Sequence, residues 1–303
     1  MAYNYVTKDG GVFDQKINQG LITSVLGNQA LQFVNGGKSF TLTTISTSGF
    51  KPHTRGTGYN SGSVTNDKKV YTMGQDRDIE FFVDKEDVDE TNQDLAVGNI
   101  TKVFIEEQAQ PEIDAYRFST LAGLAKTSTT EKLDETNVYT RLKAALLPVR
   151  KYGVTDIIGF VSTETMDYLE RSKEFTRSIT NQNVGQTALE SRVTSLDGVQ
   201  LIEVLDPTLL NTKFDFSDGF KPQADSQAIN FLFVAKSVTI PALKTQSVYL
   251  FNPGEHTKGD GYLYQNRLYH DIFVKDRKKD GVSVSIKTAT AGTSTTDSAT
   301  PSK

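Results

Sequence analysis

The feature that most constrains this fold is a pair of polar, strand-forming segments in the first third of the chain. Residues 38–50, KSFTLTTISTSGF, and 69–83, KVYTMGQDRDIEFFV, are rich in β-branched and aromatic residues and predict the two strands of a long β-hairpin. The centre of the outgoing strand, TLTTISTS, offers only Leu42 and Ile45 as large apolar residues. An isolated two-stranded hairpin is marginal in water. We therefore expect an arm that lies on another surface.

Charge is separated along this arm. The predicted hairpin tip, residues 51–69, carries one acid, Asp67, and five basic residues: Lys51, His53, Arg55, Lys68 and Lys69. Residues 76–92, DRDIEFFVDKEDVDETN, hold eight acids and two bases, so their local charge is 2 − 8 = −6 in a chain of net charge −4. One interpretation of this acidic run is a solvated strand edge followed by a helix N-terminus.

The alternative is a contact between copies of the chain. We hypothesise that an acidic shoulder meets the basic tip of a neighbouring copy, because head-to-tail contacts of this kind build rings or extended lattices. The candidate contact residues are Lys51, Arg55, Lys68 and Lys69 on the tip and Asp84, Glu86, Asp87, Asp89 and Glu90 on the shoulder.

The rest of the chain mixes helices and strands. Apolar residues at helical spacing predict one long helix over 92–124, with a kink or break at Pro111. Residues 129–236 alternate amphipathic helices with short apolar runs such as DIIGFVS and INFLFVA, which predicts an α/β block with covered strands. Two long strands are expected over 237–275, and VSVSI predicts a last one. The fold class is therefore α+β.

The sequence offers no strong candidate for a catalytic, metal or cofactor site. The chain has no cysteine, which excludes disulfides, cysteine–zinc sites and thiol nucleophiles. Gly37-Lys38-Ser39 lacks the first glycine and the helix of a phosphate-binding loop, and the acidic run lacks the glycine and final glutamate of a calcium loop. His270-Asp271 has no recognisable nucleophile. We expect no enzyme, no metal and no cofactor. No secretory signal or membrane-length apolar run is present.

Three stretches carry a family resemblance: PEIDAYRFSTLA (111–122), VTDIIGFVSTETMDYLERS (154–172) and YHDIFVKDRKKDGVSV (269–284). They resemble the major capsid proteins of tailed bacteriophages, whose architecture is called the Hong Kong 97 fold. The resemblance implies an N-terminal arm (1–35), an extended β-hairpin loop (36–84), a peripheral domain with a long spine helix and long β-strands (85–128 and 237–275), an α/β axial domain (129–236 and 276–287) and a disordered tail (288–303).

The resemblance also implies a function and its partners. Such proteins self-assemble into hexamers and pentamers of an icosahedral phage head, which encloses double-stranded DNA. We expect assembly in the bacterial host cytoplasm, a location in the virion, non-specific contact with DNA and no membrane. A separate scaffolding protein is an expected partner, because few residues precede the hairpin, and a portal is the other expected partner. No motif assigns a partner for inter-subunit cross-links at the tip lysines.

Other functions stay open at this stage. The nearest is an encapsulin-like protein nanocompartment shell, which would share the fold. A tail-tube subunit or other virion structural protein would lack the long helix. A hydrolase using His270-Asp271 would need a nucleophile within reach of that pair.

Overall fold

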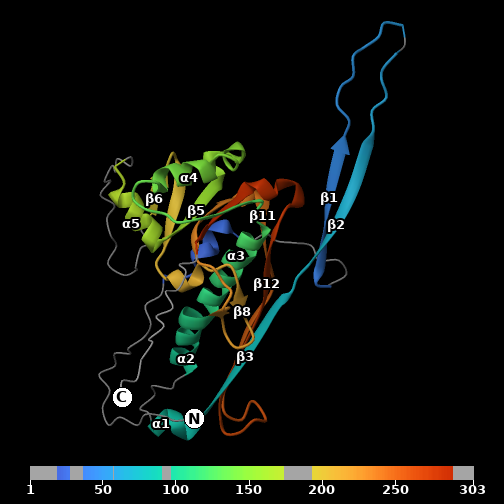
Figure 1. Cartoon of the computed structure of the whole chain (residues 1–303). Coiled ribbons are helices and arrows are strands. Elements are labelled where there is room, and N and C mark those ends of the chain that lie inside the picture. Colours follow the sequence, from blue (N-terminus) through green and yellow to red (C-terminus); the bar gives the residue numbers. More distant parts are fainter. Residues whose placement is uncertain (1–18, 28–36, 57, 91–96, 174–192, 289–303) are drawn as a thin grey trace, which may run out of the picture. The chain divides into compact units, whose positions relative to one another are not determined.

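The computed structural model describes residues 19–27, 37–56, 58–90, 97–173 and 193–288 of the chain (Figure 1). These residues fall into two compact units. With those gaps, the first unit comprises Leu26–Lys102 and Ile240–Phe273, and the second comprises residues 19–25, Val103–Thr239 and residues 274–288. Most of the predicted N-terminal arm, the predicted start of the long helix and nearly all of the predicted tail lie outside the described residues.

The second unit is built around a six-stranded mixed sheet. Its strands are β4 (Thr127–Glu131), β5 (Ile157–Ser162), β6 (Val193–Leu196), β7 (Val199–Val204), β10 (Ile229–Ala235) and β13 (Val282–Lys287). Their order is β4-β13-β10-β5-β7-β6. β5 runs parallel to β7 and β4 parallel to β13, whereas β10 is antiparallel to both of its neighbours. A small antiparallel ribbon, β8 (Phe214–Asp215) with β9 (Lys221–Pro222), belongs to the same unit.

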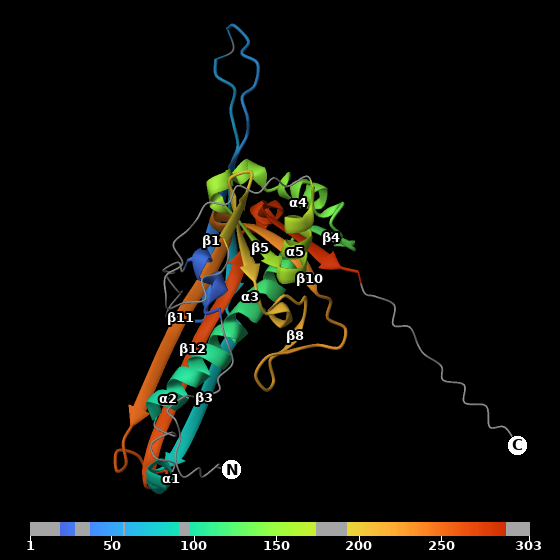
Figure 2. The same cartoon turned by 90° about the vertical axis from the view of Figure 1, so that its left-hand side faces the viewer.

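The central strands are buried because nearly all of their side chains are apolar. Every residue of β10, INFLFVA, is buried, and so are the first five residues of β5. Helices α3 (Gln110–Leu124), α4 (Val138–Leu146) and α5 (Thr163–Arg171) lie beside the sheet (Figure 2). Phe118 of α3 packs edge-on against Phe160 of β5, with ring centroids 5.1 Å apart. The mixed α+β fold class predicted from the sequence is confirmed.

The predicted long helix is continuous where the structure describes it. α2 (Val97–Phe104) passes into a π-helical turn, Ile105–Ala109, and then into α3. The backbone N–H of Gln110 donates to the carbonyl of Ile105, five residues earlier. Pro111 is the second residue of α3 and directly follows this π-helical turn. The expected disturbance at Pro111 is therefore a wider helical turn and not a break.

A buried carboxylate holds the N-terminal segment of the second unit onto α3. Asp114 accepts hydrogen bonds from the backbone N–H groups of Ile22 (2.8 Å) and Thr23 (2.9 Å) and from the Thr23 hydroxyl (2.6 Å). Arg117, one helical turn later, donates to the same hydroxyl at 3.0 Å. Burial raises the pKa of Asp114 to about 6, although the bonds from Thr23 and Ile22 and the charge of Arg117 oppose that shift.

Because its pKa is raised, Asp114 stabilises the fold at low pH, which is the opposite of a carboxyl group with a lowered pKa. Its folded pKa lies above the unfolded value of about 3.9, so its contribution is fully present below about pH 4 and is lost as the pH rises through 6. In urea unfolding of the subunit, we expect wild type to lose about 3 kcal/mol relative to Asp114→Asn between pH 4 and 7. Asp167→Asn, the same change on an exposed face of α5, is the matched control. A difference between wild type and Asp114→Asn that does not vary with pH would contradict the assignment.

The first unit contains a three-stranded sheet and a separate ribbon. The sheet has the order β11-β12-β3, with β11 at Thr239–Phe251, β12 at Gly261–Val274 and β3 at Gln75–Asp84. The ribbon pairs β1 (Ser39–Thr47) antiparallel with β2 (Val64–Thr72). A short helix, α1 (Lys85–Glu90), follows β3 directly. The two long strands predicted over 237–275 are confirmed.

The predicted return strand of the hairpin, residues 69–83, is wrong as a single strand. It is divided between β2, which pairs with β1, and β3, which pairs with β12 from Gln75↔His270 to Asp84↔Gly261. The division falls at Met73 and Gly74. Met73 is buried, and the Gly74 N–H donates to the Asp271 carboxylate at 2.8 Å. These long-range contacts take the chain out of the ribbon and into the sheet.

Candidate assembly surfaces

The β1–β2 ribbon, called the arm here together with its connecting residues 48–63, has almost no interior of its own. Every residue of β2 except Tyr71 is exposed. On β1, only Phe40 is buried, and alternate residues out to Thr47 are exposed. At about 3.3 Å per residue, each nine-residue strand is roughly 30 Å long. The polar arm predicted from the sequence is present and presents both faces to its surroundings.

The base of the arm is anchored by three aromatic rings. Phe40 stacks on Tyr71 with centroids 5.4 Å apart, and both rings meet Phe273 of β12 edge-on at 5.3 and 5.4 Å. The Tyr269 hydroxyl also donates to the carbonyl of Met73 at 3.1 Å. Aromatic pairs in such arrangements stabilise by more than their buried area. The arm is therefore fixed at its base and exposed along its length.

The predicted basic tip is shorter than the sequence suggested. Lys51 and Arg55 lie in the exposed connection 48–63, and the Lys51 ammonium donates to the carbonyl of Ser61 at 3.0 Å. Lys68 and Lys69 instead lie within β2, opposite Thr43 and Leu42. Consecutive residues of a strand point to opposite faces, so these two lysines belong to different sides of the arm. Placing them at the tip was wrong, because strand pairing extends to Val64.

The acids of the predicted shoulder gather at α1, at one end of the sheet. The Asp84 carboxylate accepts the N–H of Glu86 at 3.0 Å and so helps to begin the helix. Glu86, Asp89 and Glu90 are exposed, while Asp87 is half-buried and Val88 buried. The structure therefore brings all five predicted acids together.

Two other acids of β3, Asp76 and Glu80, differ from those of α1 because they form ion pairs within the sheet unit. Asp76 forms an ion pair with Arg267 at 2.7 Å, and the hydrogen bond from Arg267 lowers the pKa of Asp76. Glu80 pairs with Lys258. The acidic run of the sequence therefore divides into a strand with two ion-paired acids, Asp76 and Glu80, and a short helix with three exposed acids.

In the candidate catalytic pair His270-Asp271, the Asp271 carboxylate makes structural contacts with the backbone. His270 is buried on β12, and its neighbour Asp271 accepts N–H bonds from Gly74 (2.8 Å) and from Ile272 (2.7 Å). Both oxygens of the Asp271 carboxylate are therefore engaged by backbone amides, and one of them fixes the point where the arm joins the sheet. The Asp271 carboxylate therefore positions the base of the arm.

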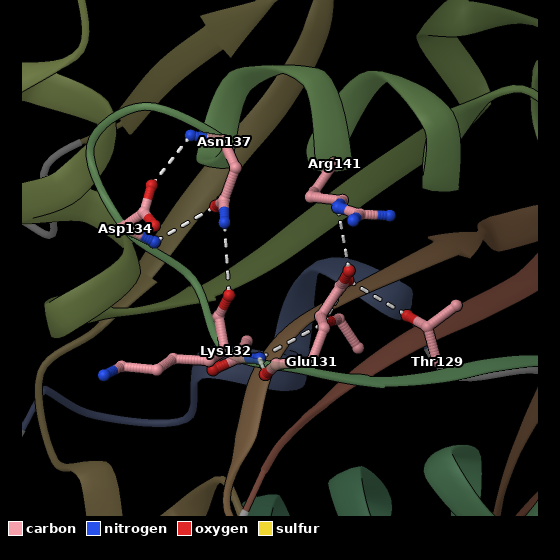
Figure 3. Close-up of polar contacts among 8 residues, drawn as sticks. Thr129, Glu131, Lys132, Asp134, Asn137 and Arg141 are labelled. Carbon is pink, nitrogen blue, oxygen red and sulfur yellow. Dashed lines mark hydrogen bonds and ion pairs between the residues drawn. The ribbon is translucent and has the colours of Figure 1, made fainter.

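A second polar cluster, in the other unit, also holds elements together (Figure 3). Glu131 at the end of β4 pairs with Arg141 of α4 at 3.2 Å and accepts from the Thr129 hydroxyl at 3.1 Å. Asp134 and Asn137 exchange hydrogen bonds, each side chain accepting the backbone N–H of the other at 3.0 Å. These reciprocal bonds fix the start of α4.

The residues that the structure describes contain no group of three or more histidines and acids arranged to hold a metal ion. In that same part of the chain, no helix is both long and apolar enough to cross a membrane.

The sequence interpretation missed the two most exposed aromatic residues in the part of the chain that the structure describes. Phe50 and Tyr59, both in the connection at the tip of the arm, are fully exposed. Large apolar side chains standing alone in a loop rich in Gly, Ser and Thr were the available signal. Their exposure became evident only when the pairing of β1 with β2 showed which residues form the loop.

Comparison with known proteins gives a likeness of structure alone. No family model and no curated protein matches the chain. Among solved structures, a chain in the capsid structure of the cyanophage P-SCSP1u matches with a TM-score of 0.64 and 12% identity, covering 94% of both chains.

Two further structures agree. A chain from the mature capsid of bacteriophage PhiM1 gives a TM-score of 0.63 at 14% identity, covering 96% of this chain and 92% of its own. A chain of Mycobacterium phage Che8 gives 0.59 at 14% identity, covering 94% and 98%. The chain therefore has a fold found in phage capsids, and the resemblance seen in the sequence is confirmed at the level of fold.

The anchoring of the arm can be tested by Phe40→Ala, which removes the buried ring shared by Tyr71 and Phe273. Loss of such a ring costs about 3 kcal/mol or more. We expect faster amide hydrogen exchange in β1 and β2 of the isolated subunit, with β5 and β10 unchanged. Ile45→Ala, at an exposed position of the same strand, is the control and should change little. Equal exchange in both variants would show that the rings do not hold the arm.

Proposed function

We propose that this chain is the major capsid protein of a tailed phage. It assembles through hexamers and pentamers into an icosahedral head that encloses double-stranded DNA. The fold, found in phage capsids over more than nine-tenths of the chain, supports this proposal. The observation that carries it is the arm. A ribbon exposed on both faces gains little stability alone, so a neighbouring copy is the surface that completes it.

The placement of charge supports a head-to-tail contact. The arm enters the sheet at Gln75, where β3 begins, and α1 follows the other end of β3, after Asp84. Tip and acidic helix therefore lie beyond opposite ends of the same strand, and one copy cannot bring its own two surfaces together. A contact between tip and helix of successive copies is heterologous, and such contacts generate rings or lattices.

Each ion pair contributes little free energy, so its effect on assembly depends on repetition in every copy of the chain. An exposed ion pair contributes about 0–1 kcal/mol and weakens with salt. In a shell, the same pairs recur in every copy, where they set register more than affinity. A capsid contact must also tolerate hexamers and pentamers, and a tip rich in glycine and serine suits that requirement.

The remaining partners follow from the same proposal. A separate scaffolding protein and a portal would direct closure of the shell in the host cytoplasm, and the mature protein would reside in the virion. The chain has a net charge of −4, so its contact with packaged DNA would be weak, sequence-independent and salt-sensitive. The role is structural and requires no catalytic residue or cofactor.

A charge swap tests the head-to-tail contact. Lys51→Glu with Arg55→Glu reverses the tip and should reduce the assembled fraction in sedimentation velocity at least several-fold, with unchanged thermal unfolding of the subunit. Adding Asp89→Lys and Glu90→Lys restores opposite signs and should recover most of the assembly, because every copy carries both changes.

The control for this test is Lys68→Glu with Lys69→Glu, which makes the same change of charge on the shaft of the arm. The tip contact is refuted if the tip reversal assembles like wild type, or if the fourfold swap fails while each reversed pair alone is tolerated. Loss of assembly in both the tip and the shaft variants would indicate that total charge, and not the tip, controls the process.

A further inference from the structure

Four segments that lie far apart in the sequence meet at one corner of the second unit. They are residue 126 and residues 151–156, 236–238 and 275–281, called the basic corner here. The N–H of Lys126 donates to the carbonyl of Lys279 at 3.4 Å, and the N–H of Lys275 donates to the carbonyl of Val238 at 3.1 Å. Residues 151–156 join the other segments through two aspartates. The corner is therefore held by backbone and side-chain bonds together.

The basic corner is positively charged in a chain whose net charge is negative. Its acids are Asp156, Asp276 and Asp280, and its bases are Lys126, Lys151, Lys236, Lys275, Arg277, Lys278 and Lys279. The local charge is therefore 7 − 3 = +4, against −4 for the whole chain. A concentration of positive charge on one surface raises the local concentration of anions.

Two of the acids are engaged within the corner. Asp156 accepts the N–H of Ser237 at 3.2 Å and its hydroxyl at 2.5 Å. Asp280 pairs with Lys151 and accepts the hydroxyl of Tyr152 at 2.6 Å. The hydrogen bonds from Lys151 and Tyr152 lower the pKa of Asp280. These two carboxylates therefore serve to join the segments of the corner.

Three of the bases are left without a carboxylate partner. The third acid, Asp276, pairs with Lys279 at 3.3 Å. Lys126, Lys236 and Lys278 make no ion pair with any residue that the structure describes. Lys126 and Lys278 are exposed, and Lys236 is half-buried. No ion pair has to be broken before these three ammonium groups can meet an outside anion.

The corner offers cations and little exposed apolar surface. Of its large apolar side chains, Val154 is exposed, Tyr152 half-buried and Val238 buried. Protein partners are usually held by aromatic or apolar anchors, and single-stranded nucleic acid by stacking on aromatic rings. Double-stranded DNA needs neither, because its phosphates supply essentially all of the free energy of non-specific binding. The phosphates of a duplex therefore fit this surface best.

We propose that the basic corner binds the phosphate backbone of double-stranded DNA, without reading its sequence, through Lys126, Lys236 and Lys278. The inference rests on the proposed function, because a shell that encloses DNA brings the duplex to its inner surface. It assigns the contact with DNA to one corner of the second unit, apart from the arm and from α1.

Binding of a fluorescently labelled DNA duplex to the purified subunit, followed by anisotropy at several salt concentrations, tests this inference. The triple variant Lys126→Gln, Lys236→Gln and Lys278→Gln should bind about tenfold more weakly at low salt. The slope of log K against log salt should become shallower by about 3, because each lost phosphate contact removes about one. Thermal unfolding should match wild type, since these three side chains form no ion pair with the described residues.

The matched control is Lys51→Gln with Lys68→Gln and Lys69→Gln, which removes the same charge from the arm, in the other unit, and should bind DNA like wild type. Equal losses in the two variants, an unchanged corner variant, or a wild-type subunit that does not bind the duplex at low salt would each overturn the basic corner.

A competitor separates DNA from an acidic protein as the partner. A polyglutamate peptide that displaces the duplex as well as unlabelled duplex does, at equal concentration of charge, would overturn the proposal in favour of an acidic protein. All of these measurements use the unassembled subunit. Failure of the basic corner therefore leaves the proposed capsid assembly standing, whereas a protein that never assembles overturns the proposed function, whatever its affinity for DNA.

Discussion

The structure depends on one constraint: a ribbon of two strands has no interior. β1 and β2 satisfy each other's backbone hydrogen bonds, yet exposed residues occupy both of their faces. Hydrophobic burial, the main source of folding stability, is therefore nearly absent from the arm beyond Phe40. The arm is therefore an extended element that adds little to the stability of the isolated chain. In the proposed assembly, contact with another copy would supply the burial that the ribbon lacks, which accounts for an element that is long and polar.

The base of the arm shows how the rest of the first unit serves this element. Phe40, Tyr71 and Phe273 form a small aromatic core, and the Asp271 carboxylate holds Gly74 where the chain turns into β3. Rigidity at the base sets the direction of the arm, while the glycine-rich tip can adapt. In the proposed assembly, a fixed base would reduce the entropy lost when the arm meets a neighbouring copy.

The sequence predicted elements whose pattern is local and missed those that depend on distant partners. INFLFVA and the long strands β11 and β12 were predictable, because apolar runs and β-branched residues mark strands directly. β4, TSTTE, is rich in threonine but has no apolar residue to mark a buried strand, and its place in the sheet is set by pairing with β13. The division at Gly74 depends on Asp271, 197 residues away. The sequence correctly predicted that the five acids of the shoulder lie together. It misplaced Lys68 and Lys69, because the pairing of β1 with β2 extends to Val64 and puts both lysines in a strand.

The central claim is that copies of the chain assemble with one another through the arm. Negative-stain electron microscopy of the purified protein tests this claim most directly. The protein is imaged alone and after co-expression with its candidate scaffolding protein. The account predicts closed shells, or rings of five and six subunits, whose arms reach the neighbouring copy. Single subunits under every condition, at concentrations where the folded protein is stable, would contradict it.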